Sequence, residues 1–284
     1  MSSSDSDTSS DSVDWDDDSS EESIEYNFTH YSYMPNQPIK VIFEGNIASG
    51  KSSLLRYLDN TYMNVDVKWE PVDEWVNDKG KNILSEYYAN PKENGLAFQL
   101  KVMNSMTMRA LRAVRDRADF VFEERSVDSA INVFSPYMVE MNFLKPEVLG
   151  LLKETGEILH SLEKRAFGVK FRSVYIIYCR STPLNCFNRN QTREGSQHNR
   201  DIPQNIFDAV HRNYENWLRK LYANTMYGQV RVFMLDTSLP MDQTKAELRR
   251  ILATIQQDAN VELKETPANA APRHIMNRAE WDCN

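Results

Sequence analysis

The chain has 284 residues, of which 41% are hydrophobic, and a formal net charge of −8 at pH 7. No apolar run approaches the roughly 20 residues needed to cross a bilayer, so we expect no membrane partner. The acidic excess is local, because residues 1–25 hold ten acidic residues and no Lys or Arg. In the rest of the chain 31 acidic residues stand against 33 basic ones, without a basic block, which argues against a nucleic-acid partner.

The first predicted segment is a disordered, acidic, Ser/Asp-rich arm over residues 1–36, because so charged a segment cannot bury enough apolar surface to fold. It could be a solubilising arm, or its serines could accept phosphate. It lacks the basic character of a mitochondrial presequence and the apolar core of a signal peptide. Cys179, Cys186 and Cys283 have no metal-ligand spacing and suit a reducing compartment. We therefore expect a cytoplasmic protein, with the nucleus as the alternative.

A buried strand is predicted over residues 39–44, then a glycine-rich loop, then a helix over 51–59. The loop sequence GNIASGKS fits G-x-x-x-x-G-K-[ST], and strand–loop–helix is the context that this phosphate-binding motif requires. Lys51 would reach the β- and γ-phosphates of ATP, and Ser52 would hold Mg²⁺. The alternative is a glycine-rich turn with an exposed lysine. The predicted nucleotide-binding residues here are Gly45, Asn46, Ile47, Ala48, Ser49, Gly50, Lys51, Ser52 and Ser53.

Further strands and helices alternate along the chain. Strands are predicted in VDVKWEPV, ending at Glu70-Pro71, in ADFVFEERS, ending at Glu123-Glu124, and over 173–180 and 230–236. Helices are predicted over 93–117, 127–140, 146–165, 203–221 and 241–257. This alternation predicts an α/β fold with a five-stranded parallel sheet covered by helices on both faces. Ligands of such sheets bind beyond the carboxyl ends of the strands. We expect one domain over residues 37–257 and a loosely ordered tail over 258–284.

Polar residues follow two of the predicted strands. Glu70, in WEPVDEW, could take the proton of an attacking hydroxyl group. In FEERS, Glu124 could hold Mg²⁺ through water while Arg125 neutralises phosphate charge. The alternatives are a solvated turn glutamate and a surface ion pair.

The polar segment 188–201 contains Arg189, Arg193 and Arg200. These arginines could close over the triphosphate and stabilise the charge that develops during transfer. An ordinary solvated loop is the alternative.

Five blocks together resemble the deoxynucleoside kinase family, the group of deoxycytidine, deoxyguanosine, mitochondrial thymidine and insect multisubstrate kinases. The blocks are IFEGNIASGKSS, WEPVDEW, YYANPKENGLAFQ, FEERSVDSAINVF and IPQNIFDAVHRNYENWL. They follow the order and spacing of the family over residues 39–236. The resemblance implies a P-loop kinase fold, ATP and Mg²⁺ as cofactors, a deoxynucleoside substrate and a homodimer.

The resemblance also implies roles for single residues. Glu70 matches the base that takes the proton of the 5′-hydroxyl, Arg125 matches the arginine that contacts the 5′-oxygen, and Glu124 matches the acid near Mg²⁺. The catalytic residues are therefore expected to be Glu70, Arg125 and Lys51. The residues matched to nucleoside contacts are Trp75 and Phe134 against the base, Phe98 near them, Tyr88 on the 3′-hydroxyl and Gln99 on the base edge.

Helical spacing agrees with a base pocket. Gln99, Val102 and Met106 share one helix face, and Ala130 and Phe134 share a face of the next helix. A glutamine on an apolar face needs a partner, which the base edge could supply. A core glutamine bonded to the backbone is the alternative. Alanine at position 130, as in thymidine-accepting relatives, favours thymidine and deoxycytidine over purine nucleosides.

The chain departs from the family pattern in two places. Ala48 stands where the family loop usually has glycine, and we expect nucleotide binding to survive this change. The segment before IP is longer than the family lid and holds a lone glutamate, Glu194. Arg189 and Arg193 are the expected lid arginines, and Glu194 is the expected second ligand of the 3′-hydroxyl.

The sequence therefore predicts an ATP-dependent deoxynucleoside 5′-kinase. A nucleoside monophosphate kinase is one alternative, although it would need basic residues where WEPVDEW places acids. A P-loop switch or scaffold that recruits a partner through its acidic arm is another.

Overall fold

A five-stranded parallel sheet lies at the centre of the computed structural model, which describes residues 37–112, 114, 118–166, 171, 173–192, 202–224 and 230–269. The strand order is β2-β3-β1-β4-β5, and every neighbouring pair is parallel. The strands are β1 (Ile39–Glu44), β2 (Val65–Lys68), β3 (Phe120–Glu124), β4 (Val174–Arg180) and β5 (Val230–Asp236). The predicted α/β fold and its five strands are confirmed. The expected arm over residues 1–36 lies outside the described residues.

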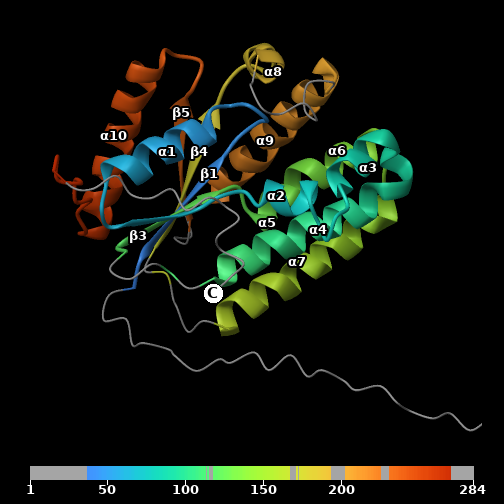
Figure 1. Ribbon diagram of the computed structural model, residues 1–284, viewed down its shortest axis with the longest axis horizontal. Coiled ribbons are helices and arrows are strands. Elements are labelled where there is room, and N and C mark those ends of the chain that lie inside the picture. The colour runs from blue at the N-terminus through green and yellow to red at the C-terminus, as the bar shows by residue number, and fades with distance from the viewer. Residues whose placement is uncertain are drawn as a thin grey trace, which may run out of the picture. The chain divides into compact units, whose positions relative to one another are not determined.

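Helices cover both faces of the sheet (Figure 1). They are α1 (Lys51–Thr61), α2 (Val72–Val76), α3 (Ile83–Ala89), α4 (Pro91–Leu111), α5 (Val127–Ser129), the π-helical turn η1 (Ala130–Phe134), α6 (Ser135–Glu140), α7 (Pro146–Ala166), α8 (Pro183–Thr192), α9 (Gln204–Asn224) and α10 (Met241–Ala259). None of these described helices is long and apolar enough to cross a membrane.

The strand β1 shows how the two faces are built. Its six residues are all buried, as expected for a central strand of a parallel sheet. Val41 and Phe43 pack in the cluster that includes residues of α1 and α10, whereas Ile42 packs in the cluster with residues of α4, η1 and α9. Because successive side chains of a strand point to opposite faces, the two clusters are separate cores on either side of the sheet.

Several element boundaries differ from the expectation. The helix predicted over 93–117 begins at Pro91 and ends at Leu111, because proline fits the first helical turn and the chain is extended at Arg112. The sequence prediction missed α2, α3 and α8. The helix predicted over 127–140 contains the π-helical turn η1.

The expected loose tail also begins later than residue 258. The helix α10 continues to Ala259, and Asn260 ends it with a left-handed φ of 50°. Beyond it the chain runs along the end of α1, where Met63 N donates to Lys264 O (2.8 Å) and Thr266 N to Thr61 O (2.8 Å). Residues up to 266 are thus held by backbone hydrogen bonds, and residues 270–284 lie outside the described part of the chain.

Candidate active site

The glycine-rich loop between β1 and α1 has the backbone that phosphate binding requires. Gly45 has a φ of 148°, and a Cβ atom there would lie 2.5 Å from the Cys179 carbonyl oxygen of β4. Gly50 has a φ of 97° and precedes the first turn of α1. Ala48 also adopts a left-handed φ, 55°, which a side chain makes costly. The two motif glycines are therefore needed for close packing and for chain direction.

Lys51 lies under this loop and is almost fully buried. Its Nζ atom donates to the carbonyl oxygens of Gly45 (3.1 Å) and Asn46 (2.8 Å). Burial and the nearby Arg125 charge lower the pKa of Lys51 to about 8, although Glu124 and Glu70 oppose the change. An ammonium group so poorly solvated gains strongly from an added anion, as phosphate binding requires.

The other predicted loop residues have distinct environments. Asn46 anchors the loop to α9, because its Nδ2 atom donates to Phe207 O (2.9 Å), while its Oδ1 accepts from Ile47 N (2.8 Å). Ser49 is buried and Ser53 is exposed.

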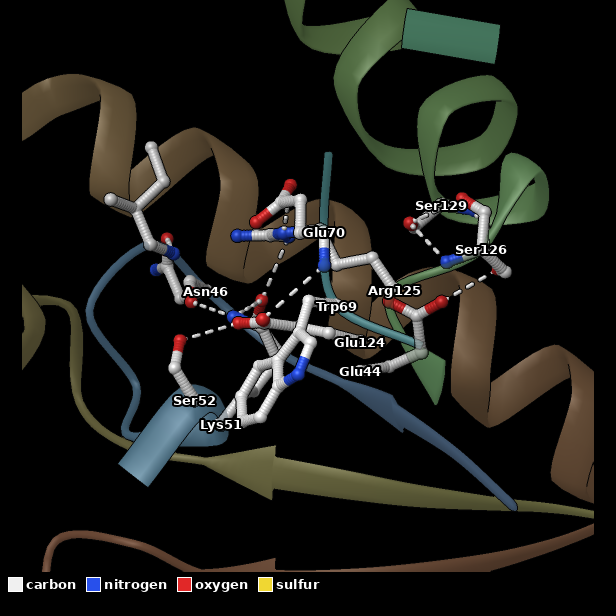
Figure 2. A network of polar contacts seen from close by, with 12 residues as sticks. Glu44, Asn46, Lys51, Ser52, Trp69, Glu70, Glu124, Arg125, Ser126 and Ser129 are labelled. Carbon is white, nitrogen blue, oxygen red and sulfur yellow. Dashed lines mark hydrogen bonds and ion pairs between the residues drawn. The ribbon is translucent and has the colours of Figure 1, made fainter. Parts of the chain in front are cut away.

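Ser52 and Glu124 meet across the mouth of the loop. Ser52 Oγ donates to Glu124 Oε1 at 2.5 Å, and the Glu70 N–H points to Glu124 Oε2 at 3.4 Å. The structure thus brings together the hydroxyl and carboxylate oxygens that the sequence analysis assigned to Mg²⁺ (Figure 2).

Glu70 and Arg125 form an ion pair beside this loop, with 2.9 Å between Arg125 Nε and Glu70 Oε1. Arg125 Nη1 also donates to Gly45 O (3.0 Å) and to the Tyr214 hydroxyl (2.7 Å). Its guanidinium lies 4.8 Å from the ring centre of Phe134. Arg125 therefore links Glu70 to the phosphate-binding loop (Figure 2) and also contacts one predicted base contact, Phe134.

Glu44 is a site residue that the sequence analysis missed. It is fully buried, and its carboxylate accepts from Ser126 Oγ (2.6 Å) and the Tyr214 hydroxyl (2.9 Å). Burial raises the pKa of Glu44 to about 7, against the opposing influence of Ser126, Arg125 and Tyr214. Its position directly before Gly45 was the only available signal, since Tyr214 is 170 residues away.

Aromatic residues gather on the α3–α4 side of the site. Phe98 stacks on Tyr87 (ring centres 4.7 Å apart) and meets Trp75 edge-on (5.8 Å). Trp75 Nε1 donates to Ser105 Oγ (2.9 Å), which fixes its ring. Tyr88 is half-buried beside them, and burial, together with Tyr137 and the Glu70 carboxylate, raises the pKa of its hydroxyl.

Gln99 has the backbone contact that the alternative interpretation foresaw. Its Nε2 atom donates to Ala130 O (2.7 Å) and Ser135 Oγ (3.0 Å). Because a carbonyl can only accept, the amide nitrogen must face Ala130, which leaves Oε1 to receive a donor from a base. Val102, Met106 and Ala130 are buried in the same apolar cluster as Trp75.

Of the predicted lid residues, Arg189 is the one within the described part of the chain. Arg189 lies within α8 rather than in a loop, and its Nη2 atom donates to Thr237 O (2.7 Å) after β5. Arg193, Glu194 and Arg200 lie outside the described residues.

Comparison with known proteins identifies the family of the chain. A family model described as Deoxynucleoside kinase matches residues 41–259. The chain belongs to the deoxynucleoside kinase family. It is therefore a phosphotransferase of P-loop kinase fold that uses ATP to phosphorylate deoxynucleosides, a reaction of nucleotide salvage.

Similar proteins with established names are deoxycytidine kinases and mitochondrial thymidine kinases. Deoxycytidine kinase of Rattus norvegicus is 28% identical over 232 residues, which cover 74% of this chain and 87% of that protein. Deoxycytidine kinase 1 of Xenopus laevis is 25% identical over 241 residues, 77% of this chain and 89% of the relative. Mitochondrial thymidine kinase 2 of Homo sapiens is 29% identical over 197 residues, 69% of this chain and 70% of the relative.

Proposed function

We propose that this kinase transfers the γ-phosphoryl group of ATP to the 5′-hydroxyl of thymidine and deoxycytidine, with Glu70 as the general base. The 5′-oxygen gives its proton to Glu70, forms a bond to the γ-phosphorus, and ADP leaves. The observation that carries the proposal is the Glu70–Arg125 ion pair, which lies beside the loop that holds Lys51. The pair orients the carboxylate, and a positioned base contributes about 10²- to 10⁴-fold.

Charge neutralisation would come from the residues around the loop. Lys51 and Arg125 share the Gly45 carbonyl, so both cations lie at the phosphate-binding loop. They would stabilise the negative charge of the transferring phosphoryl group. Arg189 and Arg193 stay predicted lid residues, and Glu194 a predicted ligand of the 3′-hydroxyl.

We further propose that Ser52 and Glu124 hold Mg²⁺. Their oxygens already approach to 2.5 Å, and Mg²⁺ prefers one or two protein oxygens plus the phosphates of the substrate. Among the described residues, no group of three or more His, Cys, Asp or Glu could form a dedicated metal cage, which agrees with such a shared site. When bound, the ion would neutralise phosphate charge.

The base preference rests on the apolar wall. Ala130 is buried with Val102 and Met106, and leaves no charged group on that side of the base. A thymine methyl group buried there would contribute roughly 0.8 kcal/mol. The relatives named deoxycytidine kinase and thymidine kinase support a pyrimidine substrate.

The test is kcat/KM for thymidine, deoxycytidine, deoxyguanosine and deoxyadenosine, with thymidine monophosphate as a control acceptor. We expect the two pyrimidine nucleosides to lead. A leading purine nucleoside would contradict the pocket assignment alone. Faster transfer to thymidine monophosphate would favour a monophosphate kinase, and ATP use that no nucleoside stimulates would favour a switch.

We also propose a homodimer through α7. Leu151, Ile158 and Leu162 are 61%, 61% and 49% exposed and recur at helical spacing on this helix. Such a stripe is costly in water and suits a second copy of the chain. Light scattering should show that Ile158→Glu is a monomer while Lys153→Glu keeps the dimer. A monomeric parent protein would contradict the proposal.

The cytoplasmic location stays a prediction.

A further inference from the structure

Arg109 lies near the end of α4 and is almost fully buried. Its guanidinium donates three hydrogen bonds to main-chain carbonyls at the carboxyl ends of β2 and β3. Nη1 donates to Glu124 O (2.6 Å) and Trp69 O (3.3 Å), and Nη2 donates to Arg125 O (2.9 Å). The three carbonyls belong to the two turns that present Glu70 and Arg125.

The sheet itself cannot hold these turns together. The paired register of β2 and β3 ends at Lys68 and Glu123, so the carbonyls beyond it need other donors. A guanidinium has five N–H donors in a rigid planar fork and can bind several carbonyls at once. Arg109 thus links the two chains one residue beyond the last paired residues of β2 and β3.

The contact to Arg125 O has a further effect, because Arg125 has a left-handed φ of 62°. Such a conformation costs on the order of 1–3 kcal/mol for a residue with a side chain and persists only when its surroundings hold it. Here the Arg125 N–H donates to Phe43 O (3.0 Å), and its carbonyl accepts from Arg109. Both sides of the strained residue are therefore fixed.

A buried ion cluster compensates the charge of Arg109. Glu123 Oε2 lies 3.6 Å from Arg109 Nη2, and Lys40 lies 3.1 Å from the same carboxyl group. Glu163 in turn contacts Lys40 at 2.8 Å. The cation is paired, so its burial beneath the two turns is compensated. Removing it would take one donor from each of the three carbonyls and leave Lys40 as the remaining cation at the Glu123 carboxylate.

We propose that Arg109 is a positioning residue for phosphoryl transfer, which sets the distance and angle between Glu70 and Arg125 through their backbone. The inference rests on the proposed roles of those two residues. It also joins base recognition to catalysis, because Gln99 and Met106 lie on the same helix. A shift of α4 would move the base contacts and the catalytic turns together.

Arg109→Ala tests the proposal, with Arg112→Ala as a matched control. Arg112 lies one turn further on, and within the described part of the chain its exposed side chain pairs with Glu74. We expect folded Arg109→Ala to lose about 10- to 100-fold in kcat, because small misplacements of catalytic groups cost this much. The KM for ATP should change far less. Added guanidinium should raise the turnover of this variant and not that of the control.

A folded Arg109→Ala enzyme with at least half the parent kcat would overturn the proposal, as would a loss that guanidinium does not restore. If this variant does not fold, Arg109→Lys replaces it, because one ammonium cannot reach three carbonyls; a parent-like kcat would then overturn the proposal. Glu70→Gln is measured in parallel. If it remains active while Arg109→Ala fails, the proposed base is wrong, whereas the positioning of Arg125 by Arg109 stands.

Discussion

The phosphate side and the base side of this site are built from different forces. On the phosphate side, Lys51, Arg125 and Glu124 are charged and buried, and each has a hydrogen bond of 2.5–3.1 Å to Gly45 or Ser52 of the phosphate-binding motif. On the base side, Phe98 and Met106 belong to an apolar cluster with one amide, Gln99. Changes on the charged side should therefore affect every nucleoside alike, whereas changes on the apolar side should depend on the base.

Lys51→Met should have the largest effect of the substitutions that test this difference. We expect kcat/KM to fall about 10²- to 10³-fold, as on loss of one preorganised donor to a developing anion, and equally for thymidine and deoxycytidine. The unfolding free energy should not fall, because burial already disfavours the charged lysine and lowers its pKa to about 8. Steady-state kinetics and urea unfolding measure the two effects. A loss of kcat/KM for one nucleoside alone would contradict the separation of the phosphate side from the base side.

Ala130→Asp should act on the other side. A carboxylate here is buried against the base, where it can accept a hydrogen bond from the cytosine amino group but repels the thymine methyl group. Thymidine should lose about tenfold more in kcat/KM than deoxycytidine. Ala130→Asn, which is similar in size and uncharged, is the control. Equal losses for both nucleosides would place the base elsewhere.

Glu44→Gln should change how stability depends on pH. The folded pKa of Glu44, about 7, lies above the ordinary value of 4.5, so the folded protein holds this proton more tightly than the unfolded chain. Wild-type stability should therefore fall as pH rises from 5 to 8, by about 2–3 kcal/mol from this group alone. The variant lacks this decrease. Urea unfolding at pH 5 and pH 8 measures this fall in stability. If the stability of the two proteins depends on pH in the same way, the raised pKa of Glu44 is refuted.

Ala48→Gly should have the smallest effect. The left-handed φ of 55° disfavours alanine, so glycine should raise the unfolding free energy by about 0.5–1 kcal/mol. The kcat should change less than about twofold, since the loop backbone is unaltered. Thermal unfolding and kinetics check both expectations. A less stable variant would show that the alanine methyl group contributes packing that outweighs the strain.

The sequence was a good guide where function depends on neighbours along the chain. The strand over 39–44, the loop from Gly45 and the turns at Glu70 and Glu124 could be predicted because strand composition, glycine spacing and acids at strand ends are local signals. The short helix α3 was missed, although Asn82 caps it by accepting from Ser85 N (2.8 Å), because its apolar pattern is brief.

The remaining site residues could not be predicted because their partners are distant in the chain. From the sequence alone, Glu44 is the last residue of a strand. Its contact with Tyr214 of α9 appears in the structure. From the sequence alone, Arg109 looks like a solvated charge on a helix. Its acceptors, the Trp69 and Arg125 carbonyls, are identified by the structure. Such contacts depend on how α4 and α9 pack against the sheet, and the spacing of residues along the sequence does not predict this packing.

The central claim is that Glu70 takes the proton of the 5′-hydroxyl. Its most direct test is single-turnover phosphoryl transfer to thymidine by Glu70→Gln, with Glu74→Gln, a neighbouring half-buried carboxylate, as the control. We predict that the variant binds ATP and thymidine as the parent does but transfers phosphate about 10²- to 10⁴-fold more slowly, because an amide cannot accept the proton. A variant that keeps more than half of the parent rate would contradict the account.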